Sequence, residues 1–196
     1  MIRLAVVGDI GSGKSYVAKQ FGYPVFNADL EVAKLYRKNR QCYNKLKKAL
    51  PNYITSFPVE KNELTKAIMA NHNNLKKIVK IIHPKVRSRM NSFIKKNKNK
   101  KFVILDIPLL IENKLNKKND ILIFVDAKKK EINKRLKKRT IVSLEVVKKL
   151  RKLQLPVEVK KKQSDFVIKN NFRNNSIKKN AKKILKKILL NARSYT

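Results

Sequence analysis

The feature that most constrains the fold of this chain is a glycine-rich segment that directly follows a short apolar run. Ile2 to Val7 is apolar except for Arg3, and the next residues read Gly8-Asp9-Ile10-Gly11-Ser12-Gly13-Lys14-Ser15. The spacing Gly-x-x-x-x-Gly-Lys-Ser is typical of a phosphate-binding loop that joins a buried strand to a helix. The sequence therefore predicts an α/β fold that begins with a strand, this loop and a helix.

This loop predicts where the phosphates of ATP bind. Backbone N–H groups of the loop and the N-terminus of the following helix form an anion site. We expect Lys14 to reach the β- and γ-phosphates and the Ser15 hydroxyl to bind Mg²⁺. The predicted nucleotide-binding residues are Gly8, Ile10, Gly11, Ser12, Gly13, Lys14, Ser15 and Tyr16. By itself the motif predicts an ATP-dependent kinase that acts on a small molecule.

Short apolar strands alternate with helices along the chain. This pattern predicts a three-layer sandwich of the P-loop NTPase type, with a parallel sheet and a mostly helical insertion after the second strand. The predicted strands cover 2–7, 23–26, 102–105, 121–125 and 166–168, and the predicted helices cover 14–21, 30–36, 41–50, 63–71, 74–96, 128–139, 143–154 and 176–191.

Two helices carry a more specific prediction. Pro84 stands inside the apolar pattern of 74–96 and is expected to break or kink that helix. The C-terminal helix is amphipathic, and its apolar face is expected to consist of Ile177, Ala181, Ile184, Leu185, Ile188 and Leu189.

Two aspartates follow predicted strands at the edge where parallel sheets bind ligands. Asp106 ends an apolar strand and is a candidate Mg²⁺ ligand, with a turn or a helix cap as the alternative role. Asp29 comes fifteen residues after Lys14 and is the candidate general base, with the N-cap of a helix starting at Leu30 as the alternative.

Arg135 and Arg139 lie one turn apart on a basic helix, so both can face the same side. We expect one or both to contact the phosphates. The alternative is that both belong to a solvated charged face of the helix.

The net charge of +37, from 50 Lys and Arg against 13 Asp and Glu, raises the alternative of a nucleic-acid-binding NTPase. The lysines are spread through every segment without an arginine-rich stripe, so we expect no nucleic-acid partner. The single cysteine, the absence of a long apolar run and a start without a signal peptide favour the cytoplasm and no membrane association. The sequence leaves a monomer or a weak homo-oligomer as the expected state.

Several further segments occur together with the loop. They read Gly22-Tyr23-Pro24-Val25-Phe26-Asn27-Ala28-Asp29, Ile82-His83-Pro84-Lys85-Val86-Arg87, Leu105-Asp106-Ile107-Pro108-Leu109-Leu110-Ile111-Glu112, Arg135-Leu136-x-x-Arg139, Gln154 and Ser164-Asp165-Phe166-Val167-Ile168-x-Asn170. With these segments in this order, the chain resembles the dephospho-coenzyme A kinase family over nearly its whole length.

The resemblance implies transfer of the ATP γ-phosphate to the ribose 3′-hydroxyl of dephospho-coenzyme A, with Asp29 as the base. His83, Arg87, Pro108 and Leu109 would then lie on the acceptor side. The resemblance also implies a nucleotide-binding core over 1–29, 100–127 and 155–196, a helical substrate domain over 30–99, and a lid over 128–154 that brings Arg139 to the phosphates.

Four positions depart from the pattern usual in this family. Asn27 stands in place of an aspartate, which is expected to alter the pKa of the proposed base or the affinity for metal. Asp9 stands in place of a glycine and brings a negative charge beside the phosphate site. Tyr16 and Thr140 replace a threonine and an acidic residue. Because the main site residues remain, we expect an active enzyme. The alternatives are a kinase for another nucleoside-type acceptor and an inactive nucleotide-binding protein.

Overall fold

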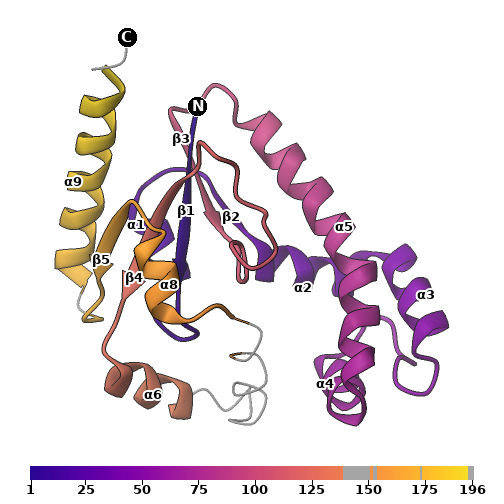
Figure 1. Cartoon of the computed structure of the whole chain (residues 1–196). Helices are drawn as coiled ribbons and strands as arrows, with labels where there is room; N and C mark the ends of the chain where they lie inside the picture. Colours follow the sequence, from indigo (N-terminus) through magenta and orange to yellow (C-terminus); the bar gives the residue numbers. More distant parts are fainter. Residues whose placement is uncertain (139–150, 152–153, 173, 194–196) are drawn as a thin grey trace. The chain divides into compact units, whose positions relative to one another are not determined.

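The structure is a computed structural model that describes residues 1–138, 151, 154–172 and 174–193 (Figure 1). The chain divides into two compact units. Unit 1 comprises Met1–Asn27 and Asn97–Thr196, and unit 2 comprises Ala28–Lys96. The predicted helix over 143–154 falls almost entirely outside the described residues.

Unit 1 is built on a parallel sheet of five strands in the order β2-β3-β1-β4-β5. The central strands are apolar and buried on both faces, as parallel strands covered on both sides require. The parallel α/β fold is therefore confirmed. The strands are β1 (Ile2–Gly8), β2 (Val25–Asn27), β3 (Phe102–Asp106), β4 (Ile121–Asp126) and β5 (Phe166–Lys169).

Helices cover the sheet of unit 1. Figure 1 shows α8 in front of the sheet and α1 behind it. One face packs on α1 and α9 through a core that includes Leu4, Ile104, Val17 and Ala181. The helices described in this unit are α1 (Lys14–Gln20), α6 (Lys129–Lys138), α8 (Val157–Lys162) and α9 (Asn174–Arg193).

The apolar face of α9 agrees with the sequence pattern at five of the six expected positions. Ile177, Ala181, Ile184 and Ile188 are buried in the core of unit 1, and Leu185 packs against that core. The prediction for Leu189 was wrong, because 36% of its surface is exposed. It stands at the border of the buried stripe, where the 3.6-residue period turns a side chain away from the sheet.

Unit 2 is helical and has its own apolar core. Its helices are α2 (Ala28–Lys38), α3 (Arg40–Ala49), α4 (Lys61–Ala70) and α5 (His72–Lys96). The core includes Leu35, Cys42, Leu46, Ile78 and Ile82.

Pro84 does not break the helix, because α5 continues through it, and the alternative of a kink stays a prediction. The proline ring removes one backbone hydrogen bond and crowds the preceding turn, at a cost of about 3 kcal/mol. The buried side chains of Ile78 and Ile82, six and two residues earlier, offset this by packing α5 into the core of unit 2.

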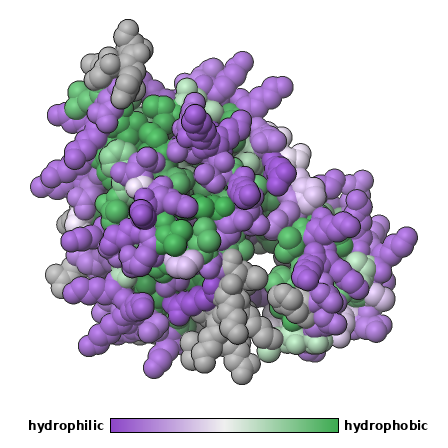
Figure 2. Space-filling model, viewed as in Figure 1, coloured by the Kyte–Doolittle hydropathy of each residue, from purple (hydrophilic) through white to green (hydrophobic). Residues whose placement is uncertain are grey.

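Hydrophilic and apolar residues are interspersed on the surface. Figure 2 shows hydrophilic side chains spread over the visible face of each unit. In the part of the chain that the structure describes, no helix combines the length and the apolar character needed to cross a membrane.

Candidate active site

The phosphate-binding loop has a backbone that requires glycine at its turns. Gly11 and Gly13 have φ angles of 83° and 92°, in the left-handed region that side chains disfavour. A Cβ atom at Gly13 would lie 2.4 Å from the Asn170 Nδ2 atom. Asn170 is buried and donates from Nδ2 to the Ser12 carbonyl oxygen at 2.8 Å. Asn170, the residue after β5, therefore fixes the loop through this hydrogen bond. Sequence reasoning did not assign this contact.

The loop leads directly into α1, as predicted. Gly13 is the N-cap of α1, and the first turn contains no acidic residue. The partial positive charge at this helix start is therefore not offset by a carboxylate within the turn. The Ile10 side chain packs against Ile132 and Leu136 of α6, so α6 lies against the loop. These features fit an anion-binding loop.

Lys14 is folded back on its own loop. Its Nζ atom donates to the Asp9 carbonyl oxygen at 2.9 Å and to the Gly8 carbonyl oxygen at 3.3 Å. An ammonium has three N–H donors, so Lys14 can turn one of them to a bound phosphate, which is a stronger partner than a carbonyl group.

Asp9, the unexpected acidic residue of the loop, is paired. Its Oδ1 atom accepts a hydrogen bond from the Ile10 N–H at 2.7 Å, and its Oδ2 atom lies 3.2 Å from the Arg151 Nη2 atom. Only 14% of the Asp9 side chain is exposed. Arg151 therefore compensates the charge that Asp9 brings to the phosphate site. The sequence holds no signal for this pairing.

The two predicted magnesium ligands are linked through Asn27. The Asn27 Nδ2 atom donates to the Asp106 carboxylate and lies 3.4 Å from the Ser15 hydroxyl oxygen. Asp106 is buried at the end of β3, directly beside Asn27 in the register of β2 and β3. Ser15 and Asp106 thus present hydroxyl and carboxylate oxygens to one small region, and such ligands suit Mg²⁺. The described residues contain no cluster of three or more His, Cys, Asp or Glu that could hold a metal by itself.

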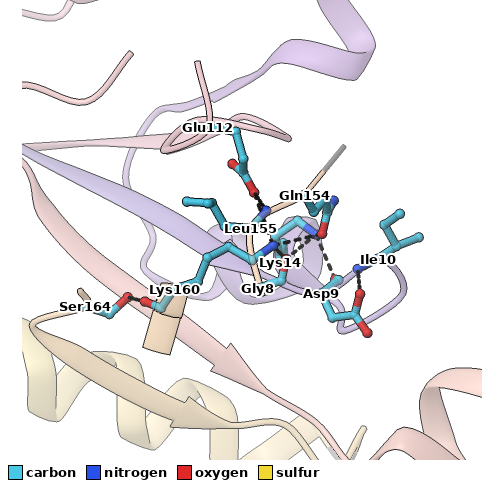
Figure 3. Close-up of polar contacts among 9 residues, drawn as sticks. All are labelled: Gly8, Asp9, Ile10, Lys14, Glu112, Gln154, Leu155, Lys160 and Ser164. Atoms are coloured by element: carbon cyan, nitrogen blue, oxygen red, sulfur yellow. Dashed lines mark hydrogen bonds and ion pairs between the residues drawn. The ribbon is translucent and has the colours of Figure 1, made fainter. Parts of the chain in front are cut away.

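A buried polar cluster borders the loop on the side of α8 (Figure 3). The Lys160 Nζ atom donates to Gln154 Oε1 at 2.8 Å and lies 3.5 Å from Glu112 Oε1. It also donates to the Gly8 carbonyl oxygen at 3.4 Å, and Glu112 accepts a hydrogen bond from the Leu155 N–H at 3.0 Å.

The remaining space in this cluster is about 10 Å³, roughly enough for one water molecule. Pro108 and Leu109 line it together with Lys14 and Gly8, so the predicted acceptor-side segment after β3 meets the loop. Lys160 was missed because the sequence does not distinguish it from its many lysine neighbours.

Asp29 belongs to unit 2, where α2 begins at Ala28. It is therefore the second residue of the helix, and the alternative role as N-cap of a helix starting at Leu30 was wrong. A carboxylate in the first turn is still favourable for the helix dipole, by about 0.3–1 kcal/mol.

His83 and Arg87 lie one turn apart on α5 in unit 2. They line an open groove of about 550 Å³ together with Pro84, Ser88 and Asn91. Burial, and to a smaller extent the Arg87 charge, lower the pKa of His83 and so favour the neutral imidazole.

The structure describes only one of the two arginines of the basic helix. The guanidinium carbon of Arg135 lies 4.4 Å from the centre of the Phe172 ring, a cation–π contact. Arg139 and Thr140 lie outside the described residues.

Comparison with known proteins agrees with this geometry. A family model described as dephospho-CoA kinase matches residues 2–177. A dephospho-CoA kinase of Wolbachia sp. subsp. Brugia malayi (strain TRS) is 34% identical over 170 residues, which cover 84% of this chain and 87% of that protein.

Solved structures share the fold. A crystal structure of a protein from Thermus thermophilus has a TM-score of 0.73 at 27% identity and covers 97% of both chains. A dephospho-CoA kinase from Campylobacter jejuni has a TM-score of 0.61 at 23% identity and covers 95% of this chain and 96% of that one.

Proposed function

The chain belongs to the dephospho-CoA kinase family, and we propose that it transfers the γ-phosphate of ATP to the ribose 3′-hydroxyl of dephospho-CoA to give CoA. The observation that carries this proposal is the family match over residues 2–177, which includes a complete phosphate-binding loop.

The donor end of the reaction is assigned to unit 1. The backbone from Gly8 to Ser15 and the start of α1 hold the phosphates, and Lys14 stabilises the charge that develops during transfer. The positive φ angles at Gly11 and Gly13 support this role, since they bring the backbone into the shape that cradles an anion. Ile10 and Tyr16 complete the nucleotide-binding set.

The proposed metal ligands are Ser15 and Asp106. Their shared contact with Asn27 supports this assignment, because it places a hydroxyl and a carboxylate in one region. When bound, Mg²⁺ would neutralise charge on the β- and γ-phosphates.

The acceptor end is assigned to Asp29, with His83, Arg87, Pro108 and Leu109 as substrate-binding residues. Asp29 would orient the acceptor hydroxyl and take its proton late, because phosphoryl transfer is largely dissociative and needs no strongly basic group. We place the substrate domain at 30–99 and the core at 1–29, 100–127 and 155–196.

We assign residues 128–154 to a lid that carries Arg139 to the phosphates. The expected cytoplasmic location and the expected monomeric or weakly oligomeric state also stay predictions.

The proposal is tested by an acceptor panel. Purified enzyme with Mg-ATP is offered dephospho-CoA, nucleoside monophosphates, shikimate and duplex or single-stranded nucleic acid, and the phosphorylated product and ADP are quantified. We expect product with dephospho-CoA at a kcat/KM at least about a hundredfold above that for any other acceptor, which corresponds to about 2.7 kcal/mol of transition-state discrimination.

Each alternative has a distinct signature in this panel. Preference for a nucleoside monophosphate or shikimate contradicts the acceptor assignment. ATP hydrolysis stimulated by nucleic acid indicates an NTPase, and ATP binding without product from any acceptor indicates an inactive relative.

A further inference from the structure

Lys160 is buried although lysine is among the residues that proteins bury least. Only 3% of its surface is exposed, whereas the next residue of α8, Lys161, keeps 42% of its side chain exposed. A buried ammonium is stable only where it is paired and hydrogen-bonded. Lys160 meets this condition through Glu112 and Gln154.

The third contact of Lys160 reaches the phosphate-binding loop. The Lys160 ammonium donates to the Gly8 carbonyl oxygen at 3.4 Å, and the Lys14 ammonium donates to the same oxygen at 3.3 Å (Figure 3). Two lysines that are far apart in the sequence therefore share one acceptor at the end of β1.

The two lysines differ in how firmly they are held. The Lys14 ammonium donates to two carbonyl groups of the loop and is expected to turn toward a bound anion, which is a stronger partner. The Lys160 ammonium is held in place by Glu112, which is itself fixed by the Leu155 N–H. Lys160 thus stays as a donor to the carbonyl group of Gly8, a buried residue.

We propose that Lys160 is a positioning residue of the phosphate-binding loop, which fixes the Gly8 carbonyl group at the start of the loop while Lys14 turns toward the phosphates of ATP. Lys160 acts through Gly8 and Lys14 and does not itself contact the substrate. This inference rests on the proposed function in taking ATP as the phosphate donor.

The experiment compares Lys160→Met, Glu112→Gln and the double variant by calorimetric titration with ATP in the absence of acceptor. Methionine keeps the length of the side chain but donates no hydrogen bond. We expect Lys160→Met to weaken ATP binding about tenfold, the effect of one charge-assisted hydrogen bond. Glu112→Gln keeps an acceptor for the Leu155 N–H and should change the Kd of ATP less than about threefold.

The double variant decides between positioning and charge neutralisation. If Lys160 serves only to neutralise Glu112, removal of both charges restores wild-type ATP binding, and this result would overturn the proposal. If Lys160 holds the loop, the double variant binds ATP as weakly as Lys160→Met. Replacing a buried ion pair by neutral groups is often tolerated, so the double variant remains informative if Lys160→Met fails to fold.

Two further variants sharpen the readout. Lys161→Met removes a neighbouring lysine that pairs with Asp126 and should leave ATP binding unchanged. Lys160→Arg keeps a donor and should recover part of the affinity. In turnover assays the KM for ATP should rise in Lys160→Met while the KM for the acceptor stays constant, and equal changes in both constants would contradict a role at the loop.

The two proposals fail separately. A wild-type enzyme that binds ATP but gives no product with dephospho-CoA contradicts the proposed function. The calorimetric comparison of ATP binding among the variants can still be interpreted in that case. Wild-type ATP binding by Lys160→Met contradicts the role of Lys160 and leaves the acceptor assignment intact.

Discussion

The side-chain amide of Asn27 donates a hydrogen bond to the carboxylate of Asp106, and the two residues are direct neighbours in the register of β2 and β3. The same amide nitrogen lies 3.4 Å from the Ser15 hydroxyl oxygen. An amide at this position therefore links the two proposed Mg²⁺ ligands without adding a second negative charge.

Asn27→Asp should make this region more dependent on Mg²⁺. The new carboxylate would face Asp106, and two close carboxylates repel each other unless a cation or a proton separates them. We expect a lower melting temperature without metal, a larger rise in melting temperature on addition of Mg²⁺, and half-maximal activity at a several-fold lower Mg²⁺ concentration. An unchanged Mg²⁺ titration would contradict a metal site at Ser15 and Asp106.

Asp29→Asn should separate binding from chemistry. Loss of a general base lowers turnover by roughly 10²–10⁴-fold, while ATP binding should stay within about twofold because the phosphate-binding loop is unaltered. Turnover and calorimetry measure the two effects. Asp126→Asn changes another aspartate next to a strand end, one paired with Lys161, and serves as the control. Near-normal turnover in Asp29→Asn would leave Asp29 only its role in the first turn of α2.

Arg151→Met should weaken ATP binding by leaving the Asp9 charge uncompensated. The pair is partly exposed, so we expect an effect of about 1 kcal/mol, or about fivefold in Kd. Asp9→Asn together with Arg151→Met should restore binding. Lys179→Met removes an exposed lysine of α9 and controls for the loss of one positive charge. A double variant that binds no better than Arg151→Met would show that Arg151 acts independently of Asp9.

Glu63→Gln should reveal a pH-dependent contribution to the stability of unit 2. Burial alone would raise the pKa of Glu63, but hydrogen bonds from Thr55, Ser56 and Glu60 outweigh it and lower the pKa from 4.5 to about 2. Because the folded-state pKa lies below the unfolded value, the stabilisation is complete above pH 4.5 and is lost as the pH falls toward 2.

We expect Glu63→Gln to lower the free energy of unfolding at pH 7 by about 1–2 kcal/mol, less than the full shift implies because solvent screens a partly exposed side chain. Urea unfolding at pH 7, 4.5 and 3 measures this difference. A deficit that stays constant across these pH values would contradict the assignment to the carboxylate charge.

Local sequence signals predicted most of the fold. The alternation of short apolar strands with amphipathic helices is a property of neighbouring residues, and it predicted the five parallel strands. Packing overrides local preference at two positions. Pro84 lies inside a continuous helix because buried side chains of α5 offset the lost hydrogen bond, and Leu189 lies at the edge of a stripe whose width depends on what the helix packs against.

The sequence by itself determined the phosphate-binding loop, because glycine, lysine and serine at this fixed spacing allow one local structure, a strand followed by a turn and a helix. Only the tertiary structure decided which charged side chains serve that loop. Arg151 and Asp9 are 142 positions apart, and Lys160 and Gly8 are 152 positions apart. In a chain with 50 Lys and Arg residues, composition does not distinguish the few that are buried. Burial and pairing depend on contacts between distant segments, which are established only when the sheet and α8 come together.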